Sequence, residues 1–320
     1  MVPAHRLPPS SISVRTQSYI QIKSQVGVVA VEEKVTFVSD GFKISGAIGF
    51  PSNMGPQETR PAMIVLHGFG SNKNAGNVQI PCKMLNDWGY ITLRFDMRSC
   101  GDSEGEFGHI LCLDQVADTR NALAFLQKHP SIDADRIGVM GSSFGAAVAL
   151  YAGSIDDRFG CVISSGGWGN GERKFRGQHP GEMAWKKFLD MLEQGRKYKE
   201  ENGRSMMVDR YDIVPVPDRM RHHILEKSVE KFPVDTAQSM FDFKAEEVIE
   251  KLSPRPLLLL HSSIDSVTPT EQSMRLFERA GKPKDLHLFN ETDHFMFAES
   301  MPRVRAVVKD WLDRYFPVNF

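Results

Sequence analysis

The sequence predicts an α/β fold, with a mostly parallel sheet, helices on both of its faces and a helical cap inserted into the chain. Over most of the 320 residues, short apolar runs that suit buried strands alternate with longer stretches of helical periodicity. Residues 167–250 break this rhythm, because they carry many charges and no convincing buried strand. We therefore expect an N-terminal extension (1–30), a core (31–166 and 251–320) and a cap (167–250).

The first half of the core opens with a hairpin, because two strand-like runs, 31–38 and 42–50, flank an Asp-Gly turn. Short apolar runs predict four further strands, at residues 62–66, 90–95, 136–140 and 160–164. Helical patterns predict the connecting helices, which are one ending near Trp88, one over 113–128 and one of small residues over 144–151.

The second half of the core repeats the pattern as a strand (257–261), a helix (270–280) and a strand (286–289). The last helix has the clearest periodicity, with apolar residues at helical spacing from Val304 to Tyr315. In the cap, residues 183–198 and 219–231 are expected to form helices.

The composition limits the partners of the protein. Apolar residues make up 41% of the chain and charged residues 25%, as in an ordinary folded protein, and the net charge is −1. Without a basic field, nucleic acid is not an expected partner, and no apolar run reaches the roughly 18 residues of a membrane span. No metal-ligand cluster, P-loop or dinucleotide fingerprint occurs, so we expect no cofactor and a small-molecule substrate, with a homodimer left open.

The four cysteines form no CxxC pair, which favours free thiols in a reducing compartment and a cytoplasmic protein. Residues 1–31 contain basic residues but no Asp or Glu, as an organelle transit peptide does. A plain terminal extension is the expected form of this segment, and a transit peptide is the alternative.

The pattern G-x-S-x-G occurs twice, at 101–105 (GDSEG) and at 141–145 (GSSFG). A nucleophilic serine in this pattern needs a strand running into it, a helix running out and small neighbours for the sharp turn. The second copy meets these conditions, because strand 136–140 precedes it and alanines follow it. The first copy lies in a loop beyond its strand, so Ser143 is the predicted nucleophile.

A serine hydroxyl needs a base to take its proton, and the base needs an acid to hold its tautomer. Downstream of Ser143, Asp265 follows strand 257–261 and His294 follows strand 286–289. Loops after the carboxyl ends of parallel strands meet at one edge of the sheet. The sequence therefore predicts a catalytic triad of Ser143, Asp265 and His294.

Other residues compete for these roles. Asp293 adjoins the triad histidine, but neighbouring loop residues rarely face each other, so we expect it to serve a turn or a cap. His261 and His287 fall inside predicted strands and are expected to be structural. His222 and His223 lie in the cap, where a solvated position is the default and a pocket role is the alternative.

The oxyanion that forms during acyl transfer needs two hydrogen-bond donors. We expect the N–H of Phe144, which follows the nucleophile, and the N–H of Phe69, in the loop after strand 62–66. Large apolar residues near the cap are candidates for the pocket wall, although each is more often plain core packing: Trp168, Met183, Trp185, Phe188, Phe295, Met296 and Phe297.

These segments together resemble the α/β-hydrolase family. The resemblance covers about residues 32–166 and 252–318, and its motifs are residues 67–70 (HGFG), 95–98 (FDMR), 101–103 (GDS), 141–145, Asp265 and His294. Residues 133–141 (DADRIGVMG) are especially similar to the dienelactone-hydrolase and prolyl-oligopeptidase-like branch, and the feruloyl esterases share the layout. The resemblance implies an eight-stranded, mostly parallel sheet and a Ser-His-Asp hydrolase. Two features depart from it: Cys100 replaces a residue that is often polar, and the cap matches no known lid.

The expected function is hydrolysis of a small to medium, partly apolar carboxylic ester through an acyl-enzyme on Ser143. The same triad serves hydrolases of carbon–carbon bonds in β-diketones, amidases, peptidases and acyltransferases, so these alternatives stay open. A ligand receptor on the same fold is the non-enzyme alternative, and the intact set of triad residues argues against it.

Overall fold

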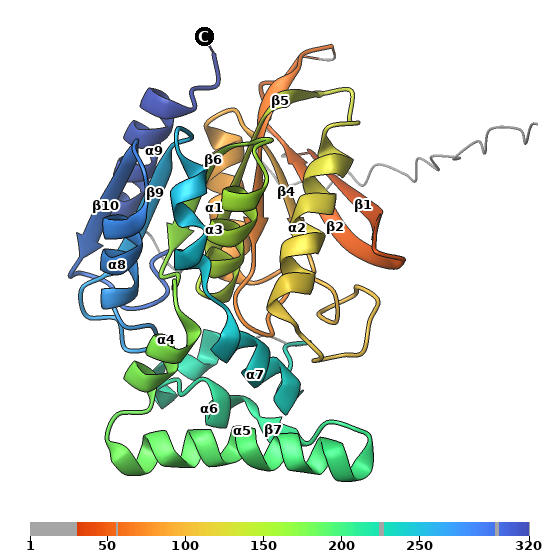
Figure 1. Cartoon of the computed structure of the whole chain (residues 1–320). Coiled ribbons are helices and arrows are strands. Elements are labelled where there is room, and N and C mark those ends of the chain that lie inside the picture. The colour runs from red at the N-terminus through yellow and green to blue at the C-terminus, as the bar shows by residue number, and fades with distance from the viewer. Residues whose placement is uncertain (1–30, 56, 224–226, 298–300, 320) are drawn as a thin grey trace, which may run out of the picture.

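The computed structural model describes residues 31–55, 57–223, 227–297 and 301–319. Its centre is a sheet of eight strands (Figure 1). Their order across the sheet is β1 (Val31–Ser39), β2 (Phe42–Phe50), β4 (Ile91–Phe95), β3 (Arg60–Leu66), β5 (Ile132–Ser142), β6 (Phe159–Ser165), β9 (Leu257–Ser262) and β10 (Lys284–Phe289). Strand β2 pairs antiparallel with β1 and β4, and all other pairs in this sheet are parallel. The predicted fold class, with an eight-stranded and mostly parallel sheet, is confirmed.

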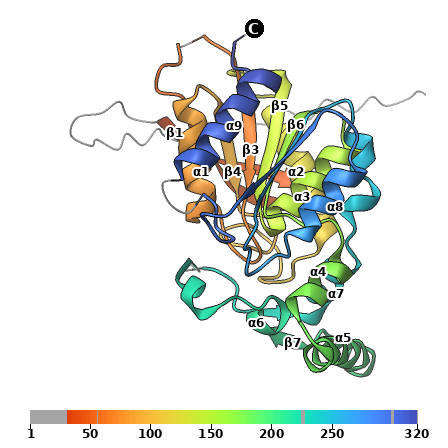
Figure 2. The ribbon, with the colours of Figure 1, turned by 90° about the vertical axis from the view of Figure 1, so that its left-hand side faces the viewer.

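Helices cover both faces of this sheet (Figure 2). Helices α1 (Gly76–Asp87) and α9 (Pro302–Tyr315) pack on one face, and α2 (Cys112–Leu126), α3 (Phe144–Ile155) and α8 (Glu271–Arg279) pack on the other. Alternate residues of a strand point to opposite faces, so a strand covered on both sides must be apolar throughout. In β3, Met63 and Val65 join the core under α1 and α9, while Ile64 and Leu66 join the core under α2 and α3.

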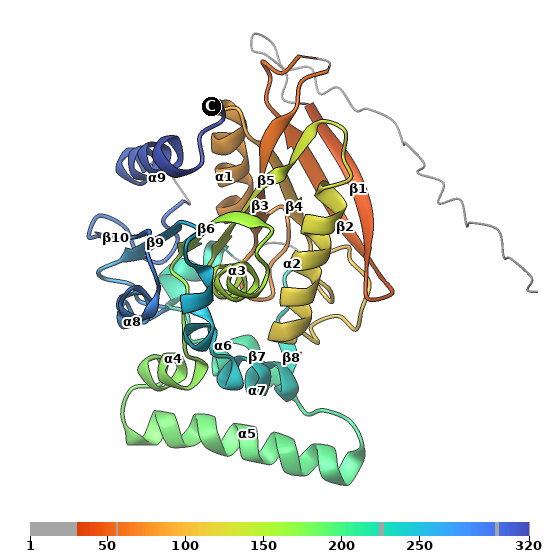
Figure 3. The same ribbon diagram turned by 45° about the horizontal axis from the view of Figure 1, so that its top comes forward.

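The segment between β6 and β9 lies at the carboxyl end of the sheet (Figures 1 and 3). It contains the helices α4 (Gly171–Gln178), α5 (Glu182–Asn202), α6 (Arg210–Ile213) and α7 (Val234–Asp242), which we call the cap helices. Two short strands, β7 (Met207–Asp209) and β8 (Lys231–Pro233), form a second, antiparallel sheet among them. The described part of this segment also contains 3₁₀ turns at Asp218–His223, Ala245–Glu247 and Ile249–Leu252.

The expected helix over residues 219–231 is wrong. The chain forms a short 3₁₀ turn that ends at His223, and Lys231 already pairs with Asp209 in the small sheet. The expectation that the cap holds no buried strand is also wrong, because Phe232 on β8 is fully buried. A three-residue strand is held by its pairing and packing, so it leaves almost no periodic signal in the sequence.

Three further expectations concern the N-terminal extension, membrane spans and the cysteines. The extension, residues 1–30, lies outside the residues that the structure describes. Within the described ranges, no helix combines the length and the apolar character that crossing a membrane requires. The four cysteines are buried free thiols.

One buried charge in the cap gives a prediction about stability. Lys174 on α4 is buried, and its ammonium group has no hydrogen-bond partner among the described residues. It lies 3.8 Å from the ring centre of Phe175 and 5.4 Å from that of Trp168. Burial lowers the pKa of Lys174 from 10.5 to about 7, because an apolar environment disfavours the charged form.

We expect Lys174→Met to raise the free energy of unfolding at pH 7 by about 2–4 kcal/mol. The unfolded chain keeps this lysine protonated up to about pH 10.4, so in the wild type stability falls as the pH drops from there to about 7. The gain from the variant should therefore shrink towards pH 10. Denaturant unfolding at pH 7 and at pH 10 measures this gain in the free energy of unfolding. Lys186→Met, at an exposed lysine, is the control. Equal gains at both pH values would contradict this account.

Candidate active site

Ser143 occupies the sharp turn between β5 and α3. Its backbone has φ of 55° and ψ of −116°, a conformation that non-glycine residues rarely adopt. Its amide donates a hydrogen bond to the carbonyl oxygen of Ser165 on β6, at 2.8 Å. The turn therefore holds the serine at the carboxyl end of the sheet, at the start of a helix.

Glycines permit this turn because backbone segments come very close to it. A Cβ atom on Gly141 would lie 2.2 Å from the carbonyl oxygen of Gly145. A Cβ atom on Gly145 would lie 2.5 Å from the carbonyl oxygen of His67 and 2.8 Å from that of Leu66. The pentapeptide requires glycine at both ends for steric reasons.

Gly145→Ala is expected to destabilise the fold by about 1–3 kcal/mol, because the added methyl group meets backbone that cannot rotate away. The helix α3 would have to move from β3, so any activity that depends on Ser143 should fall as well. Thermal unfolding measures the first effect. Gly55→Ala is the matched control, since its Cβ would have 3.8 Å of space to the nearest atom. Equal stability of the two variants would contradict the close approach.

The pentapeptide copy at residues 101–105 has another role. Ser103 lies in the loop after β4, where its hydroxyl donates to the carbonyl oxygen of Asp96 and accepts from the amide of Ser45. Its hydrogen bonds thus go to backbone groups, in the loop position that was expected for residues 101–105.

Asp265 and His294 come from the loops after β9 and β10, and they meet. The Nδ1 atom of His294 lies 2.8 Å from Oδ2 of Asp265 and 3.1 Å from its Oδ1. The amides of Val267 and Thr268 donate to the same Oδ1 at 2.8 and 2.7 Å, which fixes the carboxylate. This geometry gives His294 a proton on Nδ1 and leaves Nε2 free to act as a base.

The surroundings keep Asp265 ionised. Burial alone would raise its pKa, but the charge of His294 and the hydrogen bonds from His261 and His294 outweigh it and hold the pKa well below the usual range. His261 lies 3.3 Å from Oδ2 of Asp265 and is itself held by the hydroxyl of Ser273 at 2.6 Å. His261 is a buried residue of β9 and contacts the carboxylate of Asp265. The sequence did not indicate this contact.

The other competing residues take structural positions. Asp293 accepts hydrogen bonds from the amides of His294 and Ser266, both at 2.8 Å, and pairs with Arg219 of the cap at 2.7 Å. It therefore ties the loop of the histidine to the loop of Asp265 rather than facing the imidazole. His287 is exposed on β10 and His222 is exposed in the cap. The side chain of His223 lies outside the described part of the chain.

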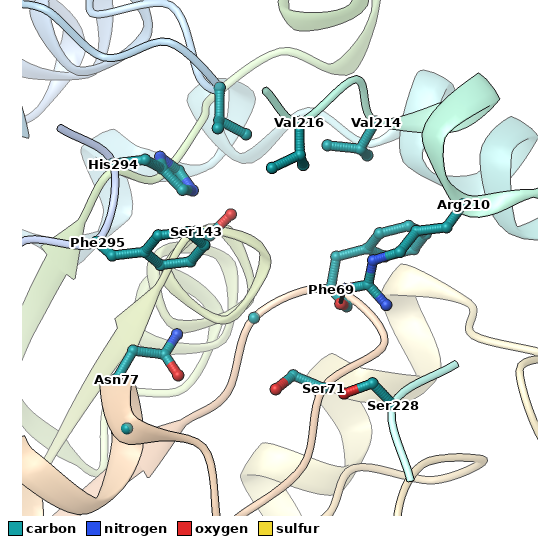
Figure 4. Close-up of a pocket in the computed structure, with 13 residues that line it drawn as sticks. Phe69, Ser71, Asn77, Ser143, Arg210, Val214, Val216, Ser228, His294 and Phe295 are labelled. Carbon is teal, nitrogen blue, oxygen red and sulfur yellow. Dashed lines mark hydrogen bonds between the residues drawn. The ribbon is translucent and has the colours of Figure 1, made fainter. Parts of the chain in front are cut away.

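A single pocket brings the serine, the histidine and the expected oxyanion loop together (Figure 4). Ser143, His294, Phe69 and Phe295 all line it. Its volume is about 110 Å³. The structure therefore places Ser143, His294, Phe69 and Phe295 at one pocket, although they come from separate loops.

The loop at residues 67–70 passes close to Ser143. His67 is buried, its Nδ1 bonds the carbonyl oxygen of Gly68, and its Nε2 accepts from the amide of Met97 at 3.0 Å. Burial lowers the pKa of His67, which keeps the imidazole neutral in this double role. The amide of Phe144 is the first of helix α3, so it has no acceptor within the helix.

Arg210 reaches this loop from the cap. Its guanidinium donates to the carbonyl oxygen of Phe69, to that of Gly70 at 3.4 Å and to that of Val229 at 2.6 Å. It also stacks 5.5 Å from the ring centre of Phe69. Sequence analysis missed Arg210, because α6 is only four residues long and belongs to no motif.

Most of the expected wall residues do not line the pocket. Phe295 does, together with the valines 214, 216 and 267. Trp168, Trp185 and Phe188 instead pack among the aromatic side chains of the cap and its base, and Met296 and Phe297 join the core under α9. Met183 is 88% exposed at the outer surface of α5. Aromatic residues on the cap helices form a small core of their own, because the helices must bury one face against each other.

Residues 57–301 match the family model described as serine aminopeptidase, S33. The chain belongs to this family. It is an α/β hydrolase, as its motifs predicted. Among the described residues, no group of three or more His, Cys, Asp or Glu is arranged to hold a metal ion.

Several relatives of this hydrolase are named for an activity, among them a thiohydrolase and a polyketide transferase. The thiohydrolase aneE of Aspergillus aculeatus is 27% identical over 275 residues, which cover 80% of this chain and 83% of the relative. The polyketide transferase grgF of a Penicillium species is 24% identical over 266 residues, which cover 80% and 86%.

Solved structures share the fold of the hydrolase. The hypothetical protein PA2218 of Pseudomonas aeruginosa superposes with a TM-score of 0.77 at 21% identity, covering 90% of this chain and 94% of that one. Est1E of Butyrivibrio proteoclasticus, solved with bound ferulic acid, has a TM-score of 0.64 at 19% identity, covering 88% and 98%. At these identities the likeness supports the fold.

Proposed function

We propose that this hydrolase cleaves small to medium, partly apolar carboxylic esters or thioesters through an acyl-enzyme on Ser143. One observation carries the proposal: the hydrogen-bonded pair of Asp265 and His294 opens into the same pocket as the strained Ser143. In this proposal Ser143 is the nucleophile, His294 is the general base and Asp265 orients the histidine.

In the first half of the reaction, Oγ of Ser143 attacks the carbonyl carbon while Nε2 of His294 takes the hydroxyl proton. The negative charge develops on the carbonyl oxygen, where the amides of Phe69 and Phe144 are proposed to donate. The intermediate then collapses, the bond to the alcohol or thiol breaks, and the leaving group takes the proton from His294. An ester bond to Ser143 remains.

In the second half, a water molecule gives its proton to His294 and attacks the acyl carbon. The bond to Oγ of Ser143 breaks, the serine recovers its proton from His294, and the carboxylic acid leaves. The ionised Asp265 supports the imidazolium in both halves, because its carboxylate accepts the Nδ1 proton.

The pocket supports a compact, partly apolar acyl group. Its wall near His294 consists of the side chains of Val214, Val216, Val267 and Phe295, and its volume of about 110 Å³ suits a short chain. A thioester is included because the relative aneE is named a thiohydrolase. The leaving thiol needs less protonation than an alcohol, so the same triad serves both.

Acyl transfer is the second candidate, since the relative grgF is named a polyketide transferase. In that reaction an alcohol or amine takes the place of water in the second half, with the same proton movements. The two functions differ only in what attacks the acyl-enzyme.

The test is a panel of 4-nitrophenyl esters of increasing chain length with the matching thioesters, assayed with and without simple alcohols and amines. A fluorophosphonate probe and intact-protein mass spectrometry on the same samples locate the acylated residue. Label at Ser143 and turnover of short esters or thioesters support the hydrolase. Faster leaving-group release with an acceptor, together with an acylated acceptor product, supports the transferase.

Turnover of a β-diketone without turnover of esters would overturn the ester proposal in favour of carbon–carbon bond hydrolysis. Absence of both turnover and label would overturn the enzyme proposal altogether and revive a ligand receptor on this fold.

A further inference from the structure

Arg210 places a positive charge in the active-site pocket that no described carboxylate balances. It lines the pocket together with Ser143 and His294 (Figure 4). Of the described residues that line this pocket none is Asp or Glu, and none of the described acidic side chains forms an ion pair with Arg210. Most other arginines of the cap pair with a carboxylate, as Arg173, Arg176, Arg196 and Arg219 do.

Three hydrogen bonds of Arg210 go to carbonyl oxygens, which carry no net charge, and a guanidinium has five N–H donors. Burial lowers the pKa of Arg210, which reflects the cost of keeping a cation away from water. A charge that is shielded from water and lacks a counter-charge is costly to the fold. In a pocket, an anionic ligand can supply the missing charge.

The side of the pocket beside Arg210 also offers neutral polar groups. Ser71 and Ser228 lie on this side, and Phe295 lies on the other side of the pocket. The hydroxyl of Ser228 is buried and has no hydrogen-bond partner among the described residues. A hydroxyl in this state is ready to donate to an acceptor oxygen of a bound molecule.

We propose that Arg210, with Ser71 and Ser228, forms a subsite for a carboxylate group of the substrate, so that the preferred substrate is a monoanionic ester or thioester. The inference rests on the proposed function, because it names the substrate class of that same site. In this arrangement the valines and Phe295 contact the apolar part of the substrate, and Arg210 binds its charged end.

Arg210 also supports the loop that carries Phe69, so a variant loses that support as well. The loop acts on every substrate, whereas the charge acts only on an anion. The informative quantity is therefore a ratio, kcat/KM for an anionic ester divided by kcat/KM for its neutral counterpart. Loss of folded enzyme or damage to the oxyanion loop cancels in this ratio.

The experiment compares 4-nitrophenyl hemisuccinate with methyl 4-nitrophenyl succinate, which differ only in the charge of the acyl end. A second arm compares 4-acetoxybenzoate with its methyl ester, where the carboxylate is on the leaving group. We expect a ratio above one in the wild type in one arm, which also tells which side of the ester carries the charge. Arg210→Gln should lower it about 10- to 100-fold, the value of a charged hydrogen bond. Arg210→Lys should keep most of it.

Arg196→Gln removes the same charge from an exposed site on α5 and should leave the ratio unchanged. A ratio that is equal in the wild type and in Arg210→Gln in both arms would overturn the subsite and leave Arg210 as a positioning residue of the loop.

A binding measurement separates this inference from the proposed function. Monomethyl glutarate, a monoanion, should raise the Tm of the wild type and of Ser143→Ala but not that of Arg210→Gln, whereas neutral dimethyl glutarate should raise none. This result supports the subsite even if no ester is turned over. Active enzyme whose Tm responds equally to both compounds would overturn the subsite and leave the hydrolase intact.

Discussion

Ser143→Ala is expected to lower kcat for an ester reporter by about 10⁴-fold or more, because no acyl-enzyme can form without its hydroxyl. The methyl group of alanine fits the same turn, so the fold should remain stable to within about 1 kcal/mol. Steady-state kinetics and thermal unfolding of the same preparation measure both effects. The fluorophosphonate label should disappear from the protein at the same time.

Ser103→Ala is the matched control, since it removes the serine of the other G-x-S-x-G copy. It deletes the hydrogen bond to the carbonyl oxygen of Asp96, which should cost about 1 kcal/mol of stability. Its kcat should stay within a few-fold of the wild type. If Ser103→Ala abolished activity and Ser143→Ala preserved it, the assignment of the nucleophile would be reversed.

Asp265→Asn is expected to lower kcat by about 10³- to 10⁴-fold while leaving the fold intact. Oδ1 of Asp265 accepts hydrogen bonds from the amides of Val267 and Thr268, so the asparagine must keep its oxygen there. Its NH₂ group then faces His294 and donates to Nδ1. The histidine proton moves to Nε2, the atom that has to accept the proton of Ser143.

The neighbouring acid supplies the control for this prediction. Asp293→Asn keeps an oxygen for the amides of Ser266 and His294 and weakens the exposed ion pair with Arg219. Because exposed ion pairs contribute at most about 1 kcal/mol, kcat should fall by less than about tenfold. Assays of both variants at pH 8 compare them directly. An equal loss in the two variants would mean that Asp293 shares the role of the triad acid.

The core could be read from the sequence because its strands are buried on both faces. Continuous apolar runs such as residues 62–66 and 257–261 are typical of buried parallel strands when helical stretches separate them. The sharp turn at Ser143 was equally clear, since steric demands restrict residues 141–145 to a recognisable pattern. Each expected strand of the core is present in the sheet.

The cap was predicted only in part. Helix α5 has enough turns to show its periodicity, whereas β8 is three residues long and depends on pairing with β7. The prediction of which apolar residues line the pocket was wrong for most of them, for a related reason. Aromatic side chains in the cap pack against each other in the cap core, and nothing in a single sequence says which of two apolar environments a tryptophan enters.

The residues that support the site were the hardest to predict. Asp265 and His294 stand out because they follow strands, but His261 and Arg210 act through contacts that the fold alone creates. A histidine inside a strand and an arginine in a charged segment are common, and their partners lie in other loops. Their roles depend on distances that no spacing in the sequence encodes.

The contact between Arg210 and the carbonyl oxygen of Phe69 joins two positions that are 141 residues apart. Because of this contact, the cap cannot simply be replaced by the cap of a related enzyme. A chimera that receives a foreign cap keeps the support of the loop at residues 67–70 only if the incoming segment brings a guanidinium to the same carbonyl groups. Substitutions on the exposed face of α5 leave this contact in place, whereas a substitution of Arg210 removes it.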